Sequence, residues 1–249
     1  MLNILWRNMK WRFQNPLSII ITIVQPLIWL VMYSAIAGQT IDNIETGNYT
    51  AFILPGIIVL VTFSACSSGG IINFIMKTSG SYYRVLIAPV KRSSIVLGQM
   101  FEAILLSFIE ILILFLVSLF FSVNFSINAV ELLLIIILIF MTAFFISSLA
   151  YAISLFLPNE VIYEMMMNAI VLPIFFLSTA LFPLENLFGL LKIVVWLNPF
   201  THIINLLRKL MFNEVLLWNE FVPVILLFLL MCCISFSFAM WRLKKETSC

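Results

Sequence analysis

The chain has 249 residues, of which 63% are hydrophobic and only 10% are charged. This composition leaves too little polar surface to cover a water-soluble globule, and the net charge of +2 is too small and too scattered to indicate a nucleic-acid partner. We therefore expect an all-α membrane protein, because long apolar segments in lipid satisfy their backbone amides as helices.

The first element, residues 1–15, is predicted to be an amphipathic helix lying along the inner membrane interface. A basic and amide stripe formed by Asn3, Arg7, Lys10 and Gln14 runs beside an apolar one. Two interpretations stay open, a positively charged topology anchor and a mechanical lever. The apolar stripe consists of Leu2, Leu5, Trp6, Met9 and Phe13.

Six later segments are apolar enough and long enough to cross a bilayer as helices. They are residues 17–37, 52–76, 93–123, 132–157, 161–182 and 221–240.

The basic residues predict how these six segments are oriented. Ten of the thirteen Lys and Arg precede the first segment, follow the second or follow the sixth. Basic residues concentrate on the cytoplasmic side of membrane proteins. We therefore expect a multi-pass protein of the plasma membrane with both termini in the cytoplasm.

The first and fifth segments carry polar and adaptable side chains among aliphatic ones. Gln25, Tyr33, Met166 and Asn168, together with Glu110 of the third segment, are candidates for lining a transport path. The alternative is that they are lipid-facing or core residues, which is the more common role of a methionine run.

The connection over residues 77–92 combines bases with Tyr82 and Tyr83 and is predicted to form a short surface helix ended by Pro89. It could dock a cytoplasmic partner, or it could be a basic loop that only fixes topology.

Two acidic residues, Glu102 and Glu110, fall in the third segment. Glu102 lies near its inner end, where a basic side chain could pair with it. Glu110 lies about 12 Å deeper along the helix. A carboxylate at that depth must face protein or water, for a structural or a functional purpose.

Residues 183–219 are too apolar for a solvated loop and too often interrupted for a seventh crossing. Asn198 can cap a helix that begins at Pro199 and runs to about Phe212, preceded by a helix over residues 185–197. A seventh crossing would also reverse the sidedness of the C-terminal bases. We therefore expect a re-entrant helical hairpin on the outer side.

Motifs for nucleotide, metal or hydrolytic chemistry are absent from the sequence. It contains no GxxxxGK[ST], GxGxxG, HExxH or GxSxG, and its single histidine, His202, cannot by itself form a metal site. We expect a chain that is not an enzyme and holds no cofactor, so any ATP chemistry requires a second protein.

Three stretches carry a family resemblance. They are PGIIV from Pro55, the stretch from Gly80 to Arg92 with Gly98 after it, and FPLENLFGLLKIVVWLNPFTHIINLLRKL. The last contains Pro183, Asn198, Pro199 and Arg208 and is the most specific. Together they resemble the type-2 permease family of ATP-binding-cassette (ABC) exporters, over nearly all of residues 1–249 as a single transmembrane permease domain.

The resemblance implies that residues 77–88 form a coupling helix that inserts into a separate ATPase. Two such ATPase subunits, which bind ATP and Mg, would serve a pair of permeases, as a homodimer or with a related chain. The exported substrate would be a drug, a lipid-linked molecule or a polysaccharide. The coupling residues would be Tyr82, Tyr83, Arg84, Lys91 and Arg92.

The sequence departs from the family pattern at two places. Thr78 and Ser79 stand where an acidic residue is often found, and His202 stands where tyrosine is common. These departures bear on docking contacts rather than on the class of protein.

Two other functions are compatible with the residues. A proton-coupled secondary carrier would use Glu110 and Glu102 as its relay and would need no ATPase. A membrane anchor or sensory subunit would use the Tyr82–Tyr83 loop only for docking.

Overall fold

The computed structural model describes residues 2–14, 16–40, 49–87, 91–121, 123–184, 188–212 and 218–246, and within these ranges the regular secondary structure is helical. This confirms the prediction of an all-α fold. The helices are α1 Leu2–Gln14, α2 Pro16–Thr40, α3 Tyr49–Thr78, α4 Ser81–Ile87, α5 Arg92–Phe120, α6 Ala129–Phe156, α7 Glu160–Phe176, α8 Gly189–Leu197, α9 Pro199–Met211 and α10 Trp218–Glu246.

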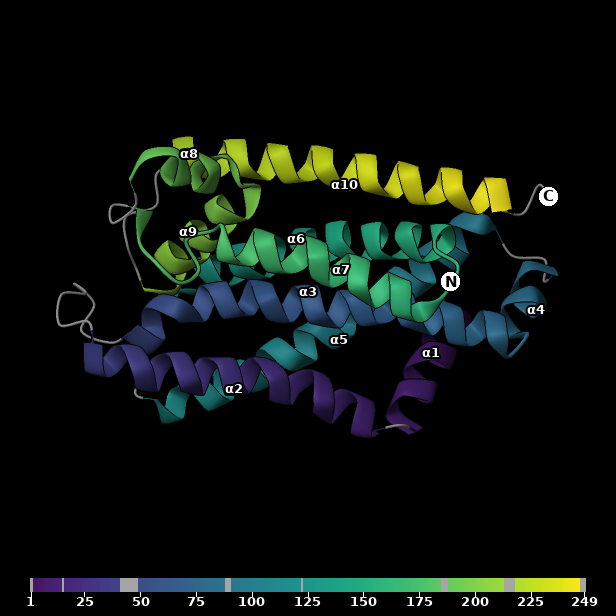
Figure 1. Ribbon diagram of the computed structural model, residues 1–249, viewed down its shortest axis with the longest axis horizontal. Coiled ribbons are helices and arrows are strands. Elements are labelled where there is room, and N and C mark those ends of the chain that lie inside the picture. The colour runs from purple at the N-terminus through teal and green to yellow at the C-terminus, as the bar shows by residue number, and fades with distance from the viewer. Residues whose placement is uncertain are drawn as a thin grey trace.

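The long helices run side by side around α3 (Figure 1). Helix α3 contacts α2, α5, α6, α7 and α9, whereas α10 packs mainly on α6. Helices α1 and α4 lie at the same end of the bundle as the C-terminal end of α10, and α8 and α9 lie at the opposite end. The main apolar cluster joins residues of α3, α5, α6 and α9.

Among the residues that the structure describes, four helices are long and apolar enough to cross a membrane, namely α3, α5, α6 and α10. The pair α8 and α9, bent by 78° at its break, raises this to five if it counts as one broken span. The protein is therefore a multi-pass membrane protein. The described apolar part of α2 covers Ile20–Ala35, and α7 has 17 residues, so both are shorter than the other four.

Helix α7 ends earlier than the sequence predicted, at Phe176 rather than near residue 182. The carbonyl oxygens of Ile174 and Leu177 accept hydrogen bonds from the Asn198 Nδ2, each at 2.7 Å. These bonds satisfy carbonyls that have no partner within a helix end, so the chain can turn inside the protein.

The connection after α3 also differs in detail from its prediction. Helix α3 continues through Lys77 to Thr78, and Gly80, with φ of +71°, turns the chain before α4 begins at Ser81. Glycine suits this left-handed turn because it has no Cβ. The predicted helix end at Pro89 lies outside the described residues.

Candidate functional site

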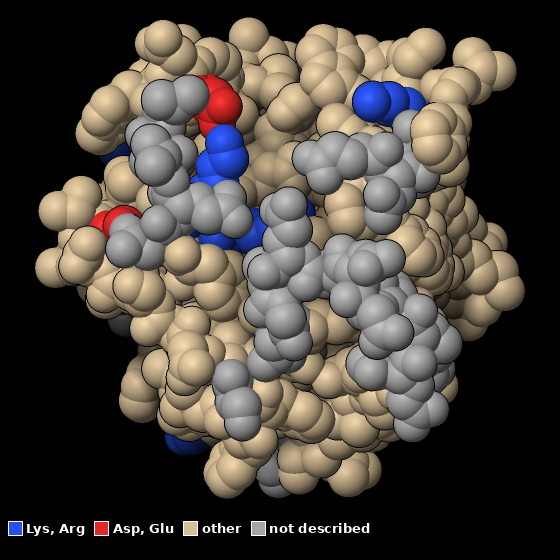
Figure 2. Space-filling view, turned by 90° about the vertical axis from the view of Figure 1, so that its left-hand side faces the viewer, with Lys and Arg blue, Asp and Glu red and all other residues tan. Residues whose placement is uncertain are grey.

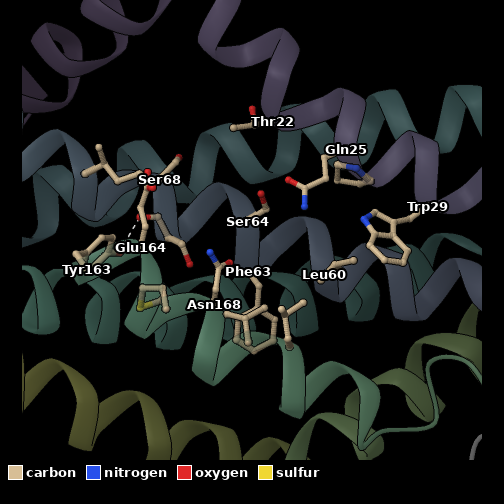
Figure 3. Close-up of a pocket in the computed structure, with 16 residues that line it drawn as sticks. Thr22, Gln25, Trp29, Leu60, Phe63, Ser64, Ser68, Tyr163, Glu164 and Asn168 are labelled. Carbon is tan, nitrogen blue, oxygen red and sulfur yellow. Dashed lines mark hydrogen bonds between the residues drawn. The ribbon is translucent and has the colours of Figure 1, made fainter. Parts of the chain in front are cut away.

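A cavity of about 290 Å³ lies between α2, α3 and α7 and is the candidate functional site (Figure 3). Helix α3 forms its floor, and the other two helices flank it. An apolar cavity would be ordinary packing space in a membrane bundle, but several of these side chains are polar. The polar lining residues are Thr22, Gln25, Ser64, Ser67, Ser68, Tyr163, Glu164 and Asn168.

The cavity changes character along its length. Figure 3 shows Ser68, Tyr163 and Glu164 at one end and Leu60 and Trp29 at the other. Ser64, Gln25 and Asn168 lie between these ends. The site can therefore offer hydrogen bonds at one end and apolar and aromatic contacts at the other.

Close packing of α7 on α3 sets the geometry of the polar end. A Cβ on Gly70 would lie 2.2 Å from the Tyr163 hydroxyl oxygen, so only glycine admits this ring. The Tyr163 hydroxyl donates to the Ser67 carbonyl oxygen at 2.7 Å. The small residues from Ser67 to Gly70 of α3 therefore allow α7 to pack closely on α3.

The structure separates the residues that the sequence suggested for a transport path. Gln25 and Asn168 line the cavity, whereas Met166 is exposed and it is the neighbouring Met167 that lines it. Tyr33 lies one turn beyond the apolar end and stacks on Trp29, with ring centroids 5.4 Å apart. Met166 therefore does not line this cavity, because helical rotation turns its side chain away.

Glu164, which was not predicted as a site residue, lies one helical turn before Asn168 on the same face of α7. Its position could have been predicted from the spacing of four residues between Glu164 and Asn168, because residues at i and i+4 lie on the same face of a helix. Both side chains are exposed in a single copy of the chain.

Glu102 and Glu110 of α5 are not among the residues that line the cavity. Arg12 of α1 is 2% exposed, pairs with Glu102 through its Nε and donates from Nη2 to the Ser68 Oγ at 2.8 Å. The expected basic partner of Glu102 is thus confirmed. Glu110 is 1% exposed, and its Oε1 accepts a hydrogen bond from Thr22 Oγ1 at 2.7 Å.

The two tyrosines of α4 point in different directions. Tyr83 is 62% exposed, but Tyr82 is 2% exposed and packs against Met76 and Leu243. The Tyr82 side chain is therefore not available to fill a pocket on another protein. Lys91 and Arg92 are exposed, and the Arg84 side chain lies outside the described residues.

Glu246, at the C-terminal end of α10, contacts residues on both sides of the turn between α3 and α4. Glu246 accepts from Lys77 Nζ at 2.6 Å and from the Tyr82 hydroxyl at 3.3 Å. Burial, together with the nearby Glu246 carboxylate, raises the pKa of Tyr82. The phenol therefore stays protonated and keeps its proton for this hydrogen bond.

At the opposite end, Asn198 caps α9 as predicted: its side chain accepts from the Phe200 backbone N–H at 3.0 Å, and Pro199 is the first helical residue. Arg208 of α9 donates to the Phe52 carbonyl oxygen at 3.1 Å and to that of Thr179 at 2.8 Å. These contacts attach α9 to α3 and to the turn after α7.

Pro183 lies in the irregular segment that follows this turn. Figure 2 views this end of the molecule, where the described surface is mostly uncharged and basic and acidic side chains lie side by side. One such pair joins Lys209 Nζ to Glu220 Oε2 at 2.5 Å.

Comparison with known proteins gives consistent matches over most of the chain. A protein of Cyanophora paradoxa named transport permease ycf38 is 30% identical over 201 residues, covering 79% of this chain and 69% of that protein. Its counterpart in Porphyra purpurea is 28% identical, with coverages of 84% and 71%. Nodulation protein J of Rhizobium meliloti is 24% identical, with coverages of 84% and 80%.

The family described as ABC-2 type transporter matches residues 1–212. This is the family that the three sequence stretches resemble, and the helical membrane bundle fits it. The chain therefore belongs to the ABC-2 type transporter family, and it is a transport permease.

Proposed function

We propose that this permease is the membrane-spanning subunit of an exporter that moves a drug, a lipid-linked molecule or a polysaccharide outward, using ATP hydrolysed by a separate subunit. The observation that carries the proposal is the polar cavity between α2, α3 and α7 in a chain without a nucleotide-binding motif. A polar lining at membrane depth is costly unless it meets water, another protein or a passing molecule. A transport path meets that requirement.

The free-energy cost of exposing polar side chains to lipid also supports pairing with a second permease. Gln25, Glu164 and Asn168 are exposed in a single copy, on the side of α2 and α7 that borders the cavity. Lipid offers these side chains no hydrogen bonds. We propose that a second permease, as a homodimer or a related chain, covers this face and that the two copies enclose the path.

The proposed arrangement places the protein in the cell membrane with six crossings, α2, α3, α5, α6, α7 and α10. Helix α1 lies along the inner interface, and both termini are cytoplasmic. Helices α8 and α9, bent by 78°, form an outer re-entrant hairpin. Basic residues beside α1, α4 and the end of α10 support this sidedness.

In the proposed mechanism, two ATPase subunits bind ATP and Mg and move α4. Tyr83, exposed on α4, is the aromatic side chain available to contact such a partner. Through the turn at Gly80 that motion would pass to α3 and so to the cavity. The cycle would open the cavity alternately to the two sides of the membrane.

Co-reconstitution of the permease with its ATPase tests this function. We expect Tyr83→Ala to lower recovery of the ATPase in a pull-down and to abolish substrate-stimulated hydrolysis, because losing a buried anchor costs above ~2 kcal/mol, or about thirtyfold in affinity. Tyr82→Phe serves as the control, since Tyr82 packs inward. Full transport by the permease alone, driven by a proton gradient and indifferent to ATP, would instead support a secondary carrier.

A further inference from the structure

The cavity contains two polar groups for which the described residues offer no partner. The carboxylate of Glu164 lines its polar end and forms no ion pair there, and the buried Ser67 Oγ has no hydrogen-bond partner among the described residues. A carboxylate accepts hydrogen bonds only, while a hydroxyl can both donate and accept. Together they would complement a group rich in N–H donors.

The helices around the cavity do not supply that group. The sequence has no Lys or Arg in residues 16–40, 49–76 or 160–184. Lys77 at the C-terminal end of α3 is not among the lining residues and is paired with Glu246. Arg12 reaches Ser68 at the polar end, but it is already paired with Glu102. A second copy that presents α2 and α7 to this face would bring another Glu164 and no cation.

The other end of the cavity favours an apolar body. Leu60 and Trp29 lie at that end, and Phe63, Val171 and Leu172 also line the cavity. An aromatic wall of this kind takes up aliphatic or aromatic groups with little hydrogen-bonding demand. The cavity is thus polar at one end and apolar at the other, like an amphiphile.

We propose that this cavity binds amphiphiles with a protonated amine, and that Glu164 is the residue that selects the amine. The ammonium group pairs with Glu164 and donates to the Ser67 hydroxyl, while the apolar body lies along Trp29 and Phe63. Such a molecule lies as a lipid does, with its charged head at the level of Arg12 and Ser68 near the inner surface. The proposal rests on the proposed function for its transport consequence, but amine binding is measurable without any ATPase.

The test measures binding of a dodecylamine that carries its dansyl label at the end of the alkyl chain opposite the free amine, using the full chain in phosphatidylcholine nanodiscs and fluorescence anisotropy. The matched probe is its N-acetylated form, which has the same apolar body and no charge. We expect Glu164→Gln to weaken binding of the amine about tenfold or more and to leave the acetylated probe unchanged, because only the amine loses a charge-assisted bond. Trp29→Ala should weaken both probes to a similar degree.

Glu160→Gln is the control, since Glu160 lies on the same helix, is exposed and is not among the lining residues. If Glu160→Gln and Glu164→Gln weakened amine binding equally, the loss of affinity would reflect the overall negative charge of the protein surface, and the proposal would be overturned. An unchanged amine affinity in Glu164→Gln, or no amine binding by the unmodified chain, would also overturn it. Unfolding curves of both variants establish that each remains folded.

Adding phosphatidylethanolamine to the nanodiscs distinguishes two sources of the same chemistry. Displacement of the amine probe would identify a lipid head group as an occupant, and no displacement would favour single-chain amphiphilic amines. Amine binding that persists while ATP-driven transport is never observed would refute the proposed exporter function and leave the binding site intact.

Discussion

Arg12 and Glu102 illustrate how single residues allow charge next to the membrane. Both are almost completely buried, at 2% and 1% exposure, and each is the ion-pair partner of the other. Arg12 also donates to Ser68 of α3, so one side chain ties α1 to both α5 and α3. A buried charge of this kind is tolerated only while its partner remains.

Removal of either member of this pair should destabilise the protein strongly. We expect Arg12→Met or Glu102→Gln alone to cost about 3–5 kcal/mol, because each leaves its partner without a counter-charge. The double variant Arg12→Met/Glu102→Leu should cost less than the sum of the single changes. Thermal unfolding in detergent micelles measures all three, and strictly additive effects would argue against a coupled pair.

Gly70 shows the same dependence on tertiary contact without any charge. We expect Gly70→Ala to destabilise by about 1–3 kcal/mol, because its Cβ would meet the Tyr163 ring and force α7 outward. Gly69→Ala should cost less, since its Cβ would lie 3.1 Å from the Ala103 Cβ, a gap that a small shift relieves. Chemical denaturation of the two variants side by side checks this order.

At the scale of elements, contacts at the helix ends attach the short helix α4 to the bundle. Helix α4 has only 7 residues, and its Tyr82 is buried and donates from its hydroxyl to Glu246 of α10. The same Glu246 carboxylate pairs with Lys77 of α3, just before the turn into α4. The coupling segment is therefore attached to the last helix as well as to α3. The sequence suggested only the connection through α3, because Glu246 lies 169 residues from Lys77.

Loss of the Glu246 contact should loosen α4. We expect Glu246→Gln to speed hydrogen exchange of the α4 amides up to about fivefold, since an exposed ion pair contributes ~0.2–1 kcal/mol. Glu220→Gln removes a comparable pair with Lys209 at the opposite end of the bundle and should leave α4 unchanged. Hydrogen-exchange mass spectrometry measures both, and a charge swap of Lys77 and Glu246 should restore protection.

For the whole molecule, the proposed sidedness makes a prediction about accessibility. In a background without native cysteines, we expect Asn124→Cys to react with an impermeant maleimide from outside intact cells. Lys244→Cys should react only after permeabilisation, because the bases at the end of α10 remain in the cytoplasm. Equal labelling of the two positions in intact cells would refute this topology.

The sequence by itself determined the class of the protein and the approximate positions of its long helices. Continuous apolar segments predicted α2, α3, α5, α6, α7 and α10, and the Asn198–Pro199 pair predicted the start of α9. These features depend on residues that are neighbours in the chain, namely on hydrophobicity and on helix capping. The family resemblance came from equally local motifs.

The tertiary structure decided which polar side chains meet. The rotation of α7 brought Glu164 and Asn168 to the cavity and turned Met166 away, and the fold of α4 buried Tyr82 while it exposed Tyr83. Helical periodicity assigns residues to a face, but it does not state which neighbouring helix covers that face. That choice depends on contacts such as Gly70 with Tyr163, which form only when distant segments pack.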